Sequence, residues 1–167
     1  MIYCSPQQIK QVQEILNDRN IIQHKFTESE GTHSEDRFGG KSEREILIEQ
    51  FSVGTFQALV SIKCLDEGVD VPPARIAIML DNSGNPREYI QRRGRVLRNY
   101  PGKEYATIYD IIIEPTIRKS MPEELKSLER KMIKKELFRY RDFANSAKNS
   151  EECLQTMRNV ESLYGVN

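Results

Sequence analysis

The sequence predicts an α/β protein in which helices cover both faces of a parallel sheet, followed by a helical extension. Over residues 1–115, short apolar runs alternate with segments of helical periodicity. After Pro115 the strand signals stop and only helical patterns continue. The 167 residues suit one domain with a small appendage, so we expect a division into residues 1–115 and residues 116–167.

The first elements of the α/β part are a strand, a helix and a second strand. Residues 2–4 form a short apolar strand, and Ser5-Pro6 then supplies a helix N-cap and a first-turn proline. Helical spacing runs over residues 9–17, and residues 21–26 are the next strand candidate. Because the chain opens inside a strand, we expect it to be a fragment of a longer protein.

The next elements follow a polar loop at residues 27–41. Ser42-x-x-Glu45 is a capping box, which predicts the start of a helix. The remaining expected elements are strands at residues 57–61, 75–80 and 105–113, and a helix that begins at Asn85-Pro86 and runs to about Arg98.

The tail after Pro115 is basic and helical. Residues 118–141 contain nine Lys or Arg against four Glu, in a long helical pattern that begins near Ser120 with Pro122 close behind. A second helix begins at Ser150. We interpret the charges as a solvated helix face, and the alternative is that they contact a nucleic-acid backbone.

Composition excludes several classes of protein. Because 25 basic residues balance 25 acidic ones, no overall field attracts nucleic acid or a membrane. Three distant cysteines and two histidines predict neither a disulfide framework nor a metal site. Neither a membrane-spanning run nor an export signal is found, so we expect a cytoplasmic protein with no membrane partner.

The helix predicted at residues 86–98 carries the clearest chemistry. At about 100° per residue, Gln91, Arg95 and Arg98 fall within roughly 60° of one another. The opposite side carries Tyr89, Ile90, Val96 and Leu97, and Arg93 also points towards it. Gathered guanidiniums suit a polyphosphate, because they stay charged and offer paired donors. The alternative is an ordinary basic face with salt-bridge partners.

An acidic loop at residues 66–73 follows the strand that ends near Ser61. Ligands of open parallel sheets bind outside the carboxyl ends of the strands, which is where this loop begins. Gly68 allows close backbone approach, and Asp70 can accept hydrogen bonds from ribose hydroxyls.

Together these segments resemble the second half of a superfamily 2 helicase of the DEAD/DEAH type. Residues 62–74 resemble helicase motif V, residues 91–98 resemble motif VI, and residues 2–5 resemble motif IV. Arg44, Phe51, Gly54 and Leu59-Val60 fit the run from motif IVa into motif V. The branch that contains restriction-enzyme motor subunits, XPB and RecG is the most similar, and the resemblance covers residues 2–113.

The resemblance implies a RecA-like three-layer fold and the role of second motor domain in an ATP-driven helicase or translocase. Arg95 and Arg98 are then arginine fingers on the γ-phosphate of ATP, and Gln91 belongs to the same interface. Gly68 and Asp70 meet the ribose side.

The resemblance also implies contacts with the backbone of DNA, or alternatively of RNA. Ser5, Arg44, and Ser61 or Ile62 are the residues at these positions. Many relatives have threonine where this chain has Ile62, which puts that one contact in question.

The nucleotide-binding motif itself is not found in this sequence. A P-loop needs G-x-x-x-x-G-K-[ST], and before Gly40-Lys41-Ser42 the first glycine position is Glu35. ATP and Mg²⁺ are therefore expected mainly on an N-terminal RecA-like domain of the same parent chain, and this chain alone should be inactive. The alternatives are a non-enzymatic nucleic-acid-binding module, a small P-loop phosphotransferase, and an α/β domain whose motifs have decayed.

Overall fold

The computed structural model describes residues 1–27, 29–31, 33, 39–62, 71, 73–81 and 86–166. The chain separates into two compact units, Met1–Ile111 and Ile112–Asn167. The functional boundary expected at Pro115 stays a prediction.

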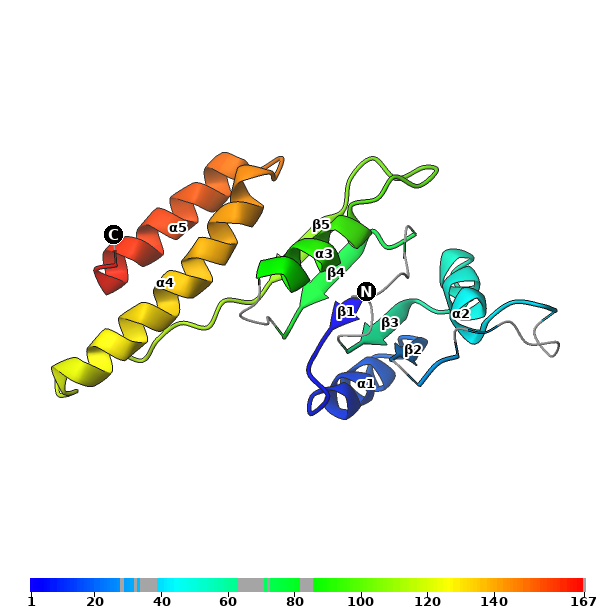
Figure 1. Cartoon of the computed structure of the whole chain (residues 1–167), viewed down its shortest axis with the longest axis horizontal. Helices are drawn as coiled ribbons and strands as arrows, with labels where there is room; N and C mark the ends of the chain where they lie inside the picture. The colour runs from blue at the N-terminus through cyan, green and yellow to red at the C-terminus, as the bar shows by residue number, and fades with distance from the viewer. Residues whose placement is uncertain are drawn as a thin grey trace. The chain divides into compact units, whose positions relative to one another are not determined.

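The first unit is built on a five-stranded parallel sheet (Figure 1). Its strands are β1 (Ile2–Tyr3), β2 (Gln23–Phe26), β3 (Ala58–Ser61), β4 (Ile76–Met79) and β5 (Thr107–Asp110). Their order is β2-β3-β1-β4-β5, so the chain starts on the central strand. In β1, Tyr3 pairs with Ser61 of β3 on one side and with Met79 of β4 on the other. The predicted parallel α/β sheet is confirmed.

Helices cover both faces of this sheet, because successive strand residues point to opposite sides. On one face, Ile2 and Val60 pack in a buried cluster with Val12 and Leu16 of α1 (Ile9–Asp18). On the other face, the buried cluster joins the sheet to α2 (Glu43–Ser52) and α3 (Pro86–Val96). Its members include Tyr3, Phe26, Leu59, Met79, Leu47 and Val96. The three-layer arrangement is therefore confirmed.

The two predicted helix starts in the first half have different outcomes. The capping box of α2 is present, since Ser42 Oγ accepts from Glu45 N and Glu45 Oε2 accepts from Ser42 N at 2.7 Å. The N-cap prediction at Ser5 is wrong. The amide of Gln8 donates to Ser5 O at 3.0 Å, which closes a turn, and α1 begins after Gln8.

The second unit is a pair of helices, α4 (Glu123–Asn145) and α5 (Ser150–Tyr164), which run side by side (Figure 1). Ile133 and Leu137 of α4 pack with Met157 of α5 in its core. α4 begins directly after Pro122 rather than near Ser120. Within the described residues, none of the helices is both long enough and apolar enough to span a lipid bilayer.

Candidate functional site

The carboxyl ends of the parallel strands bring several predicted residues to one edge of the sheet. Ser5 follows β1, and Ser61 and Ile62 stand at the end of β3. A hydrogen bond of 2.9 Å from Cys4 N to Ser61 O holds these two strand ends together. Ser61 is fully buried, and its hydroxyl donates to Ile62 O at 3.3 Å. Gly68 and Asp70, predicted for the same edge, lie outside the described residues.

Helix α3 carries two of the three side chains predicted to face phosphates, Gln91 and Arg95, and the third, Arg98, follows its end. Gln91 is exposed, Arg95 is half-buried, and Arg98 is exposed just beyond the end of the helix. The hydrogen bond from Leu97 N to Arg93 O, 3.0 Å long, extends the helical bonding towards Arg98. Arg95, four positions after Gln91, returns to its side of the helix, whereas Arg98 lies beyond Val96, where α3 ends, so helix geometry places only Gln91 and Arg95 on one side.

The buried side of α3 differs from the prediction. Tyr89 and Val96 are buried as expected, but Ile90 and Leu97 are 44% and 47% exposed. The third buried position is Arg92, at 3% exposure, whereas the sequence analysis pointed to Arg93. Residues 89, 92 and 96 follow the i, i+3, i+7 spacing, which places them in one row along the helix. The buried side of α3 is therefore narrower than the angle of about 100° per residue predicted.

Arg92 ties α3 to the sheet edge. Its Nη1 donates to Asp81 O, directly after β4, at 2.8 Å. Its Cζ lies 5.7 Å from the centre of the Tyr3 ring in β1, within the range of a cation–π interaction. The helix that presents Arg95 and Arg98 is therefore fastened to the ends of two central strands. Sequence reasoning missed this residue because neighbouring arginines are chemically alike.

Lys103 holds the other end of α3. Its Nζ donates to Val96 O and, at 3.1 Å, to Arg98 O. Carbonyl groups in the last turn of a helix lack intrahelical partners, so a cation there satisfies them. Burial, with Arg75 nearby, lowers the pKa of Lys103. Lys103 was also missed, since only the fold brings it back to the end of α3.

Arg44 is committed to the interior of the first unit. The side chain is 8% exposed, and it donates through Nε to Glu30 O at 3.0 Å and through Nη2 to Thr27 O at 3.1 Å. Its Cζ lies 5.8 Å from the ring centre of Phe26. These bonds do not support the predicted contact with a nucleic-acid backbone, because the guanidinium donates to backbone carbonyls in the turn after β2.

Glu30 completes this turn. Its carboxylate is buried and accepts from Thr27 N, from Thr27 Oγ1 at 2.8 Å and from Ser29 Oγ at 3.1 Å. Burial by itself raises the pKa of Glu30, but the hydrogen bonds from Thr27 and Ser29 outweigh it and hold the pKa below its ordinary value. The turn is thus organised around a buried carboxylate and a buried guanidinium.

The residues Gly40-Lys41-Ser42 directly precede α2, and Ser42 is its N-cap. Lys41 Nζ lies 2.6 Å from Glu49 Oε2, and Ser42 is the buried N-cap of α2. Both functional groups that a P-loop would turn towards phosphates are engaged within the protein. The phosphotransferase alternative therefore finds no support in these contacts.

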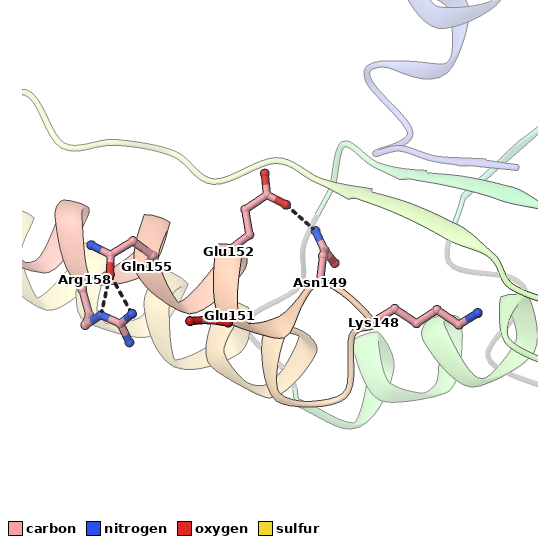
Figure 2. Close-up of a pocket in the computed structure, with 6 residues that line it drawn as sticks. All are labelled: Lys148, Asn149, Glu151, Glu152, Gln155 and Arg158. Atoms are coloured by element: carbon pink, nitrogen blue, oxygen red, sulfur yellow. Dashed lines mark hydrogen bonds between the residues drawn. The ribbon is translucent and has the colours of Figure 1, made fainter.

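The second unit has a hollow along the first turns of α5 (Figure 2). Two pairs of its lining residues bond to each other, Asn149 to Glu152 at 3.5 Å and Arg158 to Gln155 at 2.7 Å. The charges that line it are of both signs, which indicates no particular ligand.

Comparison with known proteins decides the family. Residues 1–100 match the family described as helicase conserved C-terminal domain. The chain belongs to this family. The match includes all of α3 and four of the five strands, so the predicted resemblance to superfamily 2 helicases is confirmed.

Curated relatives of this helicase C-terminal domain are much longer proteins. The DNA 3'-5' translocase XPB2 of Sulfurisphaera tokodaii is 43% identical over 58 residues, which cover 35% of this chain and 13% of that protein. UvrABC system protein B of Bordetella petrii is 35% identical over 86 residues, which cover 48% of this chain and 12% of that protein.

Solved structures agree on the fold of the helicase C-terminal domain. The C-terminal part of the Fun30 ATPase domain matches with a TM-score of 0.52 at 18% identity, covering 66% of this chain and 33% of that one. The C-terminal domain of the DEAD-box protein Dbp5 matches with a TM-score of 0.50 at 19% identity, covering 68% of this chain and 60% of that one.

Proposed function

We propose that this chain is the second motor domain of an ATP-dependent helicase or translocase that acts on nucleic acid, with DNA favoured over RNA. The family match supports a helicase role, and the similarity to a DNA translocase supports DNA. The partner in this proposal is an N-terminal RecA-like domain of the same parent chain.

The arrangement of α3 carries the proposal. Arg95 lies on α3 and Arg98 directly follows it; Arg92 of this helix is bonded to the sheet edge, and its end is bonded to Lys103. Such fastening limits the loss of side-chain and backbone freedom when a second domain closes on the helix. Arg95 and Arg98 then act as arginine fingers, with Gln91 in the same interface.

The guanidinium groups of Arg95 and Arg98 and the amide of Gln91 are suited to the phosphates of ATP rather than to Mg²⁺. Guanidinium and amide groups bind phosphate oxygens, whereas Mg²⁺ takes oxygen ligands. Among the described residues there is no group of three or more His, Cys, Asp or Glu that could hold a metal ion. The nucleotide supplies a transferable phosphoryl group, and Arg95 and Arg98 stabilise the negative charge on its oxygens. Gly68 and Asp70 are proposed for the ribose side.

Strand contacts are proposed at the carboxyl edge of the sheet. Ser5 and Ile62 are half-buried there, whereas Ser61 is fully buried and its hydroxyl donates to Ile62 O, so Ser5 and Ile62 are the more accessible residues of this edge. Contacts of this kind position a nucleic-acid backbone without reading its sequence. The predicted contact at Arg44 is the least favoured of these, because the side chain is buried and two of its donors bond to backbone carbonyls of the protein.

The test uses the motor that combines this chain with its nucleotide-binding half. Arg95→Ala and Arg98→Ala should each lower DNA-stimulated ATP turnover by about 10³-fold or more and leave DNA affinity unchanged within a few fold. The matched control is Arg19→Ala, because Arg19 is an exposed arginine directly after α1, and this change should leave turnover unchanged. Near-normal turnover in Arg95→Ala would refute the finger role, and turnover by residues 1–167 alone would refute the dependence on a second half.

A further inference from the structure

Helix α4 extends well beyond the helix that packs against it. α4 has 23 residues and α5 has 15, which correspond to lengths of about 35 Å and 23 Å. The short connection between the two helices places α5 alongside the C-terminal part of α4 (Figure 1). The buried cluster of the second unit accordingly includes Ile133 and Leu137 of α4 and no earlier residue of that helix. Among the described residues of this unit, no second helix therefore covers the first turns of α4.

An apolar row runs along these first turns. Leu125 and Leu128 are 48% and 59% exposed, and Met132 follows at a spacing of four residues. Spacings of three and four residues place the three side chains on one side of the helix. At about 100° per residue, this row lies about 120° around α4 from Ile133 and Leu137. Alternating spacings of three and four are the pattern with which one helix packs against another in a coiled coil, so the row suits a second helix.

Two side chains of opposite charge flank this row. Glu124 and Lys131 are exposed, and each directly precedes an apolar position of the row. Neither has a residue of opposite charge three or four positions away on α4, which is the spacing of ion pairs within a helix. Seven residues separate the two, so they lie on the same side of the row, two turns apart. A helix that packs on the row would bring its own side chains beside both charges.

We infer that this surface is a self-association site, on which α4 of a second copy of the chain packs in antiparallel orientation. In a two-fold pairing, Leu125 of one copy lies opposite Leu128 of the other. Met132 then lies opposite Met121, which directly precedes Pro122, the N-cap of α4, so every contact along the row is apolar. The same register places Glu124 of each copy beside Lys131 of the other, which gives two ion pairs related by symmetry.

Charge disfavours the other arrangements of the two helices. A shift of one heptad in either direction brings Glu124 beside Glu124, or Lys131 beside Lys131, across the two-fold axis. A parallel pairing brings Glu124 beside Glu129 of the other copy. Like charges in contact oppose each of these arrangements, so the register described above combines apolar contacts with attraction where the others meet repulsion.

The contact is small, which predicts a weak dimer. Its helical part, residues 123–132, is about 15 Å long, so the area that it buries is below that of stable protein–protein interfaces. We expect a dissociation constant of about 10 μM to 1 mM, so the dimer forms only at high protein concentration. The surface lies outside the residues matched by the helicase family, and the inference does not depend on the motor role proposed above.

Analytical ultracentrifugation of the full 167-residue chain measures this association. Between about 10 μM and 1 mM, the fraction of dimer should rise with concentration. Leu128→Gln places an amide at the centre of the contact in both copies and should weaken the dimer at least about tenfold. The matched control is Phe138→Gln, because Phe138 is 68% exposed on α4 beyond the row, and this change should alter the dissociation constant by less than about twofold.

A charge exchange tests the orientation and the register. Glu124→Lys and Lys131→Glu each turn both ion pairs into contacts between like charges, so each variant alone should dimerise about 3- to 30-fold more weakly. An equimolar mixture of the two variants should recover the dimer, because opposite charges then meet at both contacts. The control is Lys10→Glu, which makes the same change of net charge as Lys131→Glu on a side chain of α1 that is 88% exposed, and it should have no effect.

Several results would overturn the inference. A chain that stays monomeric at every concentration would assign the apolar row to a different partner, and a dimer that Leu128→Gln leaves unchanged would assign the contact to a different surface. A stronger dimer of Glu124→Lys would indicate the parallel pairing, and a mixture that fails to recover would exclude the register. Because the substituted side chains are exposed, the variants should fold, and circular dichroism checks this. A failure here leaves the ATP turnover test of Arg95 unaffected, and the reverse holds too.

Discussion

Replacing Arg44 by methionine tests whether this residue holds the first unit together or meets nucleic acid. Methionine keeps much of the apolar length of the side chain and removes every donor. The carbonyls of Glu30 and Thr27 would lose their charged partners, which lie 3.0 and 3.1 Å away. The face of the Phe26 ring would lose the guanidinium at 5.8 Å.

The magnitude follows from these contacts. A hydrogen bond from a charged donor contributes about 1.5–3 kcal/mol, and a desolvated cation–π pair adds up to about 2 kcal/mol. Removing a buried charge offsets part of this loss. We expect Arg44→Met to lower the free energy of unfolding of the first unit by about 2–4 kcal/mol. Arg44→Lys keeps a cation but only part of the hydrogen bonding, so its free energy of unfolding should lie between those of the unchanged chain and Arg44→Met.

Urea unfolding followed by circular dichroism measures this change. With a slope of about 2 kcal/mol per molar urea, the midpoint of the first unit should fall by about 1–2 M. The control is Arg141→Met, because Arg141 is about half-exposed and pairs with Glu161 at 2.7 Å, an arrangement that contributes at most about 1 kcal/mol. If Arg44→Met leaves the midpoint unchanged but weakens DNA binding, the structural role is wrong and the original prediction of a phosphate contact holds.

Three further changes test other contacts. Ser42→Ala removes the cap of α2 and should cost about 1 kcal/mol in thermal unfolding, whereas Ser42→Gly should cost only a few tenths. The pKa of the Glu30 carboxyl is lower in the folded protein than in the unfolded chain. The carboxylate therefore stabilises the fold fully at pH values above the unfolded pKa of about 4.3, and this stabilisation is lost as the pH falls through the folded pKa. Glu30→Gln should therefore flatten the fall in stability between about pH 5 and pH 3, and an unchanged profile would exclude this carboxylate as the source. Lys103→Met leaves two carbonyls at the end of α3 without their cation, so amide hydrogen exchange at residues 96–98 should quicken, whereas Lys10→Met should not change it.

Local features of this protein were predictable because neighbouring residues are enough to produce them. The capping box of Ser42 and Glu45 spans a single turn, and the alternation of apolar strands with amphipathic helices indicates the parallel sheet directly. The spacing of Gln91 and Arg95 likewise depends only on helix geometry, since both lie within α3. The local prediction at Ser5 failed because Ser5 and Gln8 bond to each other in a turn: Gln8 N donates to Ser5 O, and Ser5 N donates to the Gln8 side chain. The helix begins only after this turn.

By itself the sequence determined the order of the elements and the family. The tertiary structure decided which of two adjacent arginines, Arg92 or Arg93, turns inward, because its partners are the ring of Tyr3 in β1 and the carbonyl of Asp81 just after β4. It likewise assigned Arg44 to the turn after β2 and Lys103 to the end of α3. These partners lie in other elements or across a turn of the chain, and periodicity within one helix contains no information about the distances to them.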